Sequence, residues 1–111
     1  MKAYTDIYQS KKLAEILSIE SADMGYLWNG ISSYCDYPVS NQTIFKRIEN
    51  IPCWSFAALM DVLDCVSSFK TPQGWTCQTY VGPKVVTSNY YSNPVDACVE
   101  IILKLKEKNL I

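Results

Sequence analysis

The sequence contains no histidine, and its 111 residues include only four glycines. Because histidine is the most common general base and metal ligand, Cys-His and Ser-His-Asp nucleophile systems cannot be built within this chain. Zinc sites that combine cysteine with histidine are excluded for the same reason. The few glycines form no glycine-rich phosphate-binding loop. We therefore expect no enzyme, no metal site and no cofactor.

Neither sign of charge is in excess. Ten Lys and Arg residues stand against 11 Asp and Glu residues, for a formal net charge of -1. Proteins that bind nucleic acids usually carry a clustered basic face that neutralises several phosphates. The even charge therefore argues against a nucleic-acid partner, and a weak nucleic-acid binder is kept only as an alternative.

Long hydrophobic runs are missing as well. No stretch approaches the ~18 apolar residues of a membrane span, and the first residues, MKAYTDIYQSKK, lack the apolar region of a secretion signal. We expect a cytoplasmic protein without membrane contact that folds as a single domain over residues 1–111. No CxxC pair occurs, so five free thiols are expected, at Cys35, Cys53, Cys65, Cys77 and Cys98.

Two segments with helical periodicity begin with clear capping residues. Residues 6–17 predict an amphipathic helix in which Asp6 is the N-cap and Gln9 completes a capping box. Near the end of the chain, Asn93 fits an N-cap and Pro94 the first helical position. The apolar stripe of this last helix is Val95, Cys98, Ile101, Ile102 and Leu105.

A third helix is predicted within residues 51–66, IPCWSFAALMDVLDCV. Ser55 is the expected N-cap, and Trp54 is expected to pack on Leu59 as a hydrophobic staple. Cys53 comes just before this helix, where a helix N-terminus can lower the pKa of a thiol and make it nucleophilic. A thiol-dependent enzyme that uses Cys53 is therefore the second alternative function.

The strands are predicted from period-two patterns and turn residues. Residues 24–29, MGYLWN, alternate and predict a short strand. Residues 75–81 and 84–91 are rich in β-branched and aromatic side chains and flank Gly82-Pro83, which predicts a β-hairpin.

The elements follow one another in the order helix, strand, helix, hairpin, helix. Residues 31–50 show no clean period and predict an irregular connection. The order predicts an α+β fold, with about three helices packed on one face of a small antiparallel sheet of about three strands.

Aromatic residues gather in two regions, 26–37 and 75–91. Tyr and Trp are enriched at the energetic centres of protein interfaces. We therefore expect a non-enzymatic interaction protein that binds a protein partner or itself through an aromatic sheet face. The residues predicted for this face are Tyr26, Trp28, Tyr80, Tyr90 and Tyr91.

Four blocks of the sequence carry a resemblance: AYTDIYQSKKLAEIL, ESADM, IPCWSFAALMDVL and NPVDACVEIILKL. In these blocks the chain resembles a family of short uncharacterised proteins found in prophages and mobile elements of Bacteroides-type gut bacteria. The resemblance implies an intracellular bacterial or phage product. It implies no activity, cofactor or catalytic residue.

Overall fold

The computed structural model describes residues 1–40, 49–63 and 66–111. Its helices are α1 (Ile7–Ala14), the 3-10 helix η1 (Ile19–Ser21), α3 (Phe56–Val62) and α4 (Pro94–Glu107). Its strands are β1 (Met24–Tyr26), β2 (Ile51–Cys53), β3 (Val66–Thr71), β4 (Gly74–Val81) and β5 (Lys84–Thr87).

The strands form two antiparallel sheets. β1 pairs with β2, and β4 lies between β3 and β5 in a three-stranded sheet. The predicted α+β class is confirmed. The described part of the chain has five strands in two sheets where the sequence predicted about three strands in one, and the unpredicted strands are β2 and β3.

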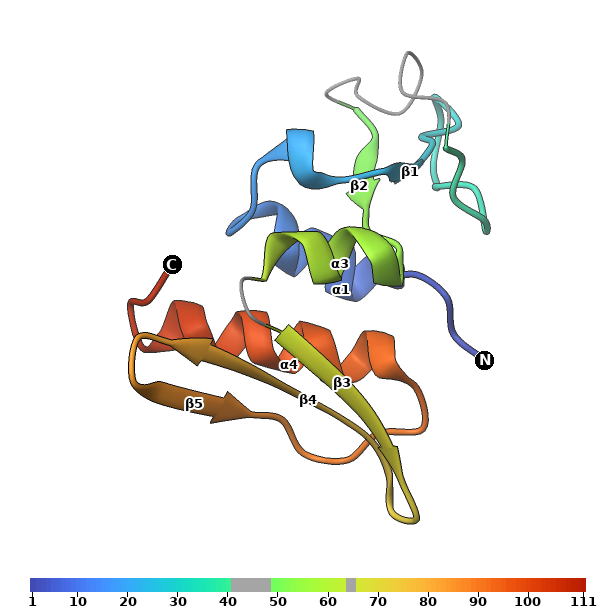
Figure 1. Ribbon diagram of the computed structural model, residues 1–111. Helices are drawn as coiled ribbons and strands as arrows, with labels where there is room; N and C mark the ends of the chain where they lie inside the picture. The colour runs from blue at the N-terminus through green and yellow to red at the C-terminus, as the bar shows by residue number, and fades with distance from the viewer. Residues whose placement is uncertain (41–48, 64–65) are drawn as a thin grey trace.

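Helix α4 lies between two layers of the molecule (Figure 1). On one side it packs along β4 and β5, and on the other it contacts α3 and α1. Helix α1 also packs on β2. The structure thus corrects one detail of the predicted packing, because α4 covers the three-stranded sheet while α1 lies against the small one.

The position of α4 explains its composition. A helix packed on two sides must be apolar around most of its surface. Val95, Cys98, Ile101 and Ile102 are completely buried, and so is Ala97, which lies outside the predicted stripe. Each large aliphatic side chain removed from water in this way contributes about 1.5–3 kcal/mol.

The predicted caps of α1 and α4 are confirmed. The Asp6 carboxylate accepts a hydrogen bond from the Gln9 amide at 2.8 Å, and the Gln9 side chain accepts one from the Asp6 amide at 3.1 Å. Asn93 Oδ1 accepts from the Asp96 amide at 2.9 Å, and Pro94 occupies the first turn. These bonds satisfy backbone donors that have no partner within the helix.

Two helices end earlier than predicted. α1 ends at Ala14, although Leu17 beyond it still packs against the core. α3 ends at Val62, and Val66, the last residue of the range in which this helix was predicted, begins β3 instead.

The predicted hairpin is present as β4 and β5, with Gly82 at a φ of 61° in the turn. Positive φ is a conformation that glycine adopts without steric cost. Beyond β5 the chain stays next to β4, because Trp75 and Tyr91 exchange two backbone hydrogen bonds of 2.7 and 2.8 Å. The second half of the predicted hairpin is therefore a short strand followed by an isolated bridge.

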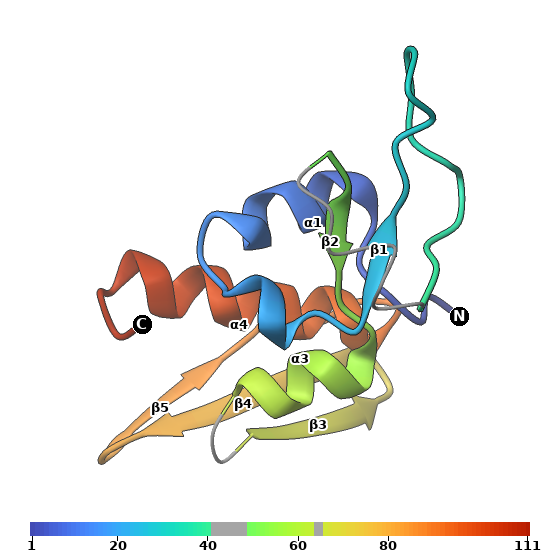
Figure 2. The same cartoon turned by 90° about the horizontal axis from the view of Figure 1, so that it is seen from above.

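After β1 the chain forms an extended arm that projects from the rest of the molecule (Figure 2). A bridge between Trp28 and Tyr34 closes the arm, and the Cys35 amide donates to the Leu27 carbonyl at 2.9 Å. Part of the predicted irregular connection, residues 41–48, lies outside the described residues.

The longest helix of the described residues is α4, with 14 residues. Within the described ranges, no helix combines the length and apolar character that crossing a bilayer requires.

Candidate interaction surface

The three-stranded sheet has one covered and one uncovered face. Cys77 of β4 points toward α4, where its Sγ lies 3.6 Å from the Sγ of Cys98, and it is completely buried. Successive side chains of a strand point to opposite faces, so the neighbours of Cys77, Thr76 and Gln78, face away from α4. Tyr80 follows on the same side.

The strand register extends this uncovered face across the sheet. Directly paired residues share a face, and Tyr80 pairs with Val85 of β5 while Thr76 pairs with Phe69 of β3. Tyr91 shares a face with its bridge partner Trp75, which places Tyr90 on the opposite side. We call this surface the outer face and define it by Ser67, Phe69, Thr71, Thr76, Gln78, Tyr80, Val85, Thr87 and Tyr90.

Four large side chains of the outer face are half exposed. The exposed fractions are 46% for Phe69, 46% for Tyr80, 50% for Val85 and 54% for Tyr90. A group of large exposed apolar side chains is typical of an interaction site.

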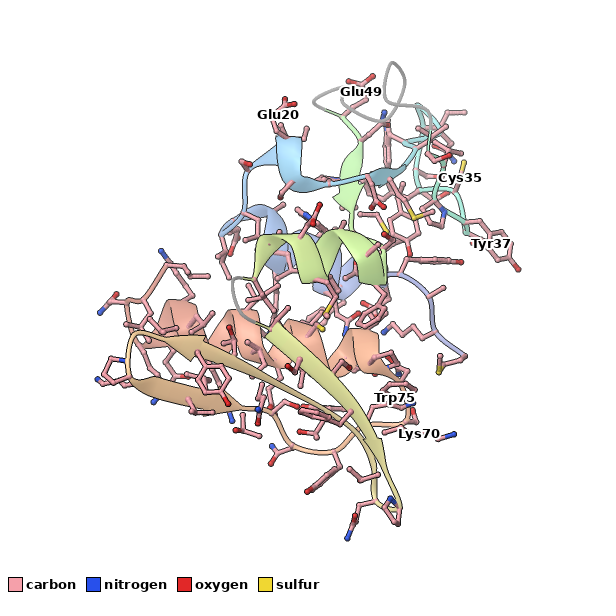
Figure 3. The ribbon with its side chains drawn as sticks, in the orientation of Figure 1. Glu20, Cys35, Tyr37, Glu49, Lys70 and Trp75 are labelled. Atoms are coloured by element: carbon pink, nitrogen blue, oxygen red, sulfur yellow. The ribbon has the colours of Figure 1, made fainter. Side chains whose placement is uncertain are left out.

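No residue of the outer face carries a charge; the residues between the large side chains are Ser, Thr and Gln. The two lysines of the sheet, Lys70 and Lys84, pair with Trp75 and Val81 and so belong to the register of the other face. Figure 3 shows Lys70 and Trp75 near the β3–β4 turn, at one end of the sheet. Desolvating the outer face therefore requires no burial of a charge.

Two polar side chains of the outer face, those of Thr76 and Gln78, make hydrogen bonds within the protein. Thr76 is 9% exposed, and its Oγ1 donates to the Ser88 carbonyl at 3.0 Å. Gln78 Nε2 donates to the Tyr80 hydroxyl at 3.4 Å, which links the two side chains along β4.

The structure brings only two of the five predicted interface residues together. Tyr80 and Tyr90 lie on the outer face. Tyr91 lies on the other face, where its hydroxyl donates to Glu100 Oε1 at 2.9 Å. Burial and this bond to an anion both raise the pKa of Tyr91. Its placement on the interaction surface is therefore corrected to a link between the sheet and α4.

The predicted placement of Tyr26 and Trp28 on the interaction surface is also corrected. Tyr26 is 3% exposed, and its hydroxyl donates to the Thr5 carbonyl at 2.8 Å, so it belongs to the core beneath the small sheet. Burial is the largest cause that raises its pKa. Trp28 lies in the arm, half buried against Tyr34 with 5.0 Å between the ring centroids.

Sequence reasoning missed Phe69 and Val85. Val85 was inside the predicted hairpin, and its pairing with Tyr80 follows from the register around Gly82. Phe69 was missed because it lies in residues 67–74, for which no helix or strand was predicted. The sequence carries little signal for this strand, because Phe69 stands among the polar residues 67–71.

Cys53 does not lie at a helix N-terminus. It is the last residue of β2 and is completely buried. Its Sγ accepts a hydrogen bond from Thr5 Oγ1 at 3.5 Å and donates to the Thr5 carbonyl at 3.3 Å. Burial, the largest cause, raises the pKa of the thiol. These features are opposite to those of an activated cysteine nucleophile.

The predicted Ser55 cap of α3 is confirmed, and Trp54 belongs to the core. Ser55 Oγ accepts from the Ala58 amide at 3.2 Å, and both its amide and its hydroxyl donate to the Asp23 carboxylate. Trp54 and Leu59 are completely buried in the same core cluster.

One polar cluster connects the start of α1 to the start of α4. Lys2 Nζ lies 2.9 Å from both Asp6 Oδ2 and Asp96 Oδ1, and Gln9 Nε2 donates to Asp96 Oδ1 at 2.7 Å. Burial raises the pKa of Asp96, but the hydrogen bonds from Lys2, Asn93 and Gln9 outweigh it and hold the pKa below its usual value. The cluster connects the N-terminal ends of the two helices and includes no residue of the outer face.

Comparison with known proteins does not extend this picture: no family model, no curated protein and no solved structure matches the chain.

Proposed function

We propose that this protein is a non-enzymatic interaction module that binds a protein partner through the outer face. The observation that carries the proposal is the contrast between the two faces of the three-stranded sheet. One is covered by α4, whereas the other is uncharged and holds Phe69, Tyr80, Val85 and Tyr90 half exposed.

The outer face has the chemistry of an interface core. Interface cores are depleted of charge and enriched in aromatic side chains, and their affinity comes mainly from a few well-placed anchors. Tyr80 and Tyr90 are such anchors, because each combines a large apolar ring with a hydroxyl for hydrogen bonding. Tyr80 belongs to β4, and α4 packs along the other side of this strand.

A second copy of the chain is the other partner that fits the proposal. Two uncharged faces meet without repulsion between like charges, and sheets stack face to face at about 10 Å. The same residues would then contact each other across a two-fold axis. Self-association is thus a second outcome of the same experiment.

The proposal extends to the compartment and the origin of the protein. We propose a cytoplasmic bacterial protein of phage or mobile-element origin, which the resemblance of the four sequence blocks supports. The described cysteines are free thiols, as is usual in a reducing compartment.

The two alternatives have less support. A thiol-dependent enzyme would need an accessible, activated cysteine, and Cys53 is buried with a raised pKa. Nucleic acid can stack on aromatic side chains of a sheet, but such sites also use basic residues to follow the phosphates. The outer face offers no basic residue.

The test compares outer-face variants with matched exposed tyrosines elsewhere. Tyr80→Ser and Tyr90→Ser remove anchors, while Tyr8→Ser and Tyr37→Ser remove tyrosines that are 68% and 75% exposed away from the sheet. Proteins captured from a bacterial lysate are identified by mass spectrometry, and sedimentation velocity measures self-association.

We expect each outer-face substitution to weaken binding or self-association at least about fivefold, and the controls to leave it unchanged. The melting temperatures of all four variants should stay close to that of the parent protein. Capture that is equal for outer-face and control variants, with no self-association, would refute the proposal.

A further inference from the structure

We propose that Cys77 and Cys98 form a site of reversible oxidation, at which an intramolecular disulfide joins β4 to α4. Both are free thiols in this structure, and both are completely buried between the sheet and the helix. The Cys98 thiol donates a hydrogen bond to Cys77, with 3.6 Å between the two Sγ atoms.

The two sulfur atoms are close enough to react after a small movement. A disulfide has an S–S bond of about 2.05 Å, so the sulfurs must approach by roughly 1.5 Å, which side-chain rotation and a slight shift of α4 can supply. By contrast, the Cys53 thiol is hydrogen-bonded to Thr5, and Cys35 is exposed on the arm. Of the described cysteines, Cys77 and Cys98 are the pair brought together.

The hydrogen bond gives the two sulfurs different reactivity. The donated bond from Cys98 lowers the pKa of Cys77, although burial acts in the other direction. The same bond, together with burial, raises the pKa of Cys98. Cys77 is therefore the sulfur that becomes a thiolate and reacts first.

A peroxide is the oxidant class that fits a buried pair, because hydrogen peroxide is small. The Cys77 thiolate attacks one peroxide oxygen and becomes a sulfenic acid, while the other oxygen leaves as hydroxide and takes up a proton to form water. The Cys98 sulfur then displaces the hydroxyl group from Cys77, and its proton leaves with that group as a second water. In sum, two thiols and one hydrogen peroxide yield one disulfide and two waters.

The disulfide would link α4 covalently to β4, the central strand of the sheet on which the helix packs. The two cysteines are 21 positions apart, so the bond closes a loop that contains β5. A disulfide that closes a loop of this size stabilises the folded protein mainly by reducing the conformational entropy of the unfolded chain. The expected gain in melting temperature is about 10 °C.

The sequence allows the pairing to be mapped directly. Trypsin releases Cys77 in the peptide Thr71–Lys84 and Cys98 in Val85–Lys104, whereas the remaining cysteines lie in Leu13–Lys46 and Ile48–Lys70. The folded protein is treated with hydrogen peroxide, blocked with iodoacetamide and digested without reductant. The Cys35→Ser variant is treated in parallel, to remove disulfides between molecules through the exposed thiol.

We expect a linked Thr71–Lys84 and Val85–Lys104 pair that has lost two hydrogen atoms and that dithiothreitol separates. The melting temperature should rise on oxidation by about 10 °C in the parent protein and in Cys35→Ser, but not in Cys98→Ala. Linkage through either other peptide would overturn the proposal. So would alkylation of both Cys77 and Cys98 after unfolding of the peroxide-treated protein, a result that needs no variant to fold.

Discussion

The backbone of Gly74 lies so close to that of Tyr91 that a Cβ atom at position 74 would be 2.6 Å from the Tyr91 carbonyl oxygen. Gly74 also has a φ of 130°, a conformation that side chains rarely allow. This close approach carries the segment after β5 alongside β4 and so positions Tyr90 on the outer face.

Gly74→Ala is therefore expected to destabilise the protein strongly. The methyl group meets backbone, which cannot move aside as a side chain can, and we expect a loss of about 2–3 kcal/mol in the free energy of unfolding. Urea denaturation measures it. Gly30→Ala is the matched control, because Gly30 has a φ of 87° but nothing within 4 Å of an added Cβ. A loss at position 74 no larger than that at position 30 would contradict the close contact.

Asp96 is expected to contribute to stability in a pH-dependent way. Because its pKa is lower in the folded protein, the folded state binds fewer protons than the unfolded one, and protonation favours unfolding. The contribution is present at neutral pH and is lost as the pH falls below the ordinary value of 3.8.

Urea midpoints measured from pH 7 to pH 2 test this expectation. Asp96→Asn should lower the midpoint at pH 7 and flatten its decrease at acidic pH, because Lys2 loses its partly buried anionic partner. Asp61→Asn, which changes an exposed carboxylate of α3, should follow the parent protein at every pH. An unchanged acid response in Asp96→Asn would show that the cluster at the helix ends is not coupled to folding.

Cys53 is expected to react slowly with alkylating reagents. Its thiol is completely buried and protonated, whereas Cys35 is exposed. In the folded protein, iodoacetamide should modify Cys35 at least about a hundredfold faster than Cys53, since Cys53 reacts only when the structure opens. Peptide mapping at successive times gives both rates. Comparable rates would restore Cys53 as a candidate nucleophile.

Ser68 of β3 offers a stabilising substitution. Its Oγ is buried and, among the buried side-chain nitrogen and oxygen atoms of the described residues, is the one without a hydrogen-bond partner. Removing an unsatisfied buried hydroxyl relieves its desolvation cost, so Ser68→Ala should raise the free energy of unfolding by about 0.5–1 kcal/mol. Thr76→Ala is the contrasting variant, because the Thr76 hydroxyl is bonded to Ser88 and its loss should destabilise. A destabilising effect at both positions would show that Ser68 has a partner.

The features predicted correctly from the sequence depend on neighbouring residues. The caps at Asp6 and Asn93 and the turn at Gly82 are local chemistry, which a short window of sequence specifies. The strand β2 was missed because Pro52 lies at its centre, and proline normally argues against a strand. The strand β3 was missed because an edge strand with polar residues has little hydrophobic signal.

The outer face could be predicted only in part, because a local sequence pattern does not specify which face of a sheet is covered. Alternation within β4 places Tyr80 and Cys77 on opposite faces of the sheet, but it does not specify which face a helix covers. Tyr26 has the same alternating signal, yet its side is covered through contacts with Thr5, which is distant in the sequence. Burial set by such distant contacts is not contained in a local pattern.

Helix α4, which the two layers share, is the last element of the fold to leave the ribosome. While the chain is being translated, β3, β4 and β5 emerge before the helix that covers them, and α1 and α3 emerge earlier still. Both sides of the core therefore remain open to solvent until residues Pro94–Glu107 have been synthesised. The core can be completed only after this helix has emerged, and ribosome-bound chains that stop before it should expose apolar surface to chaperones and proteases.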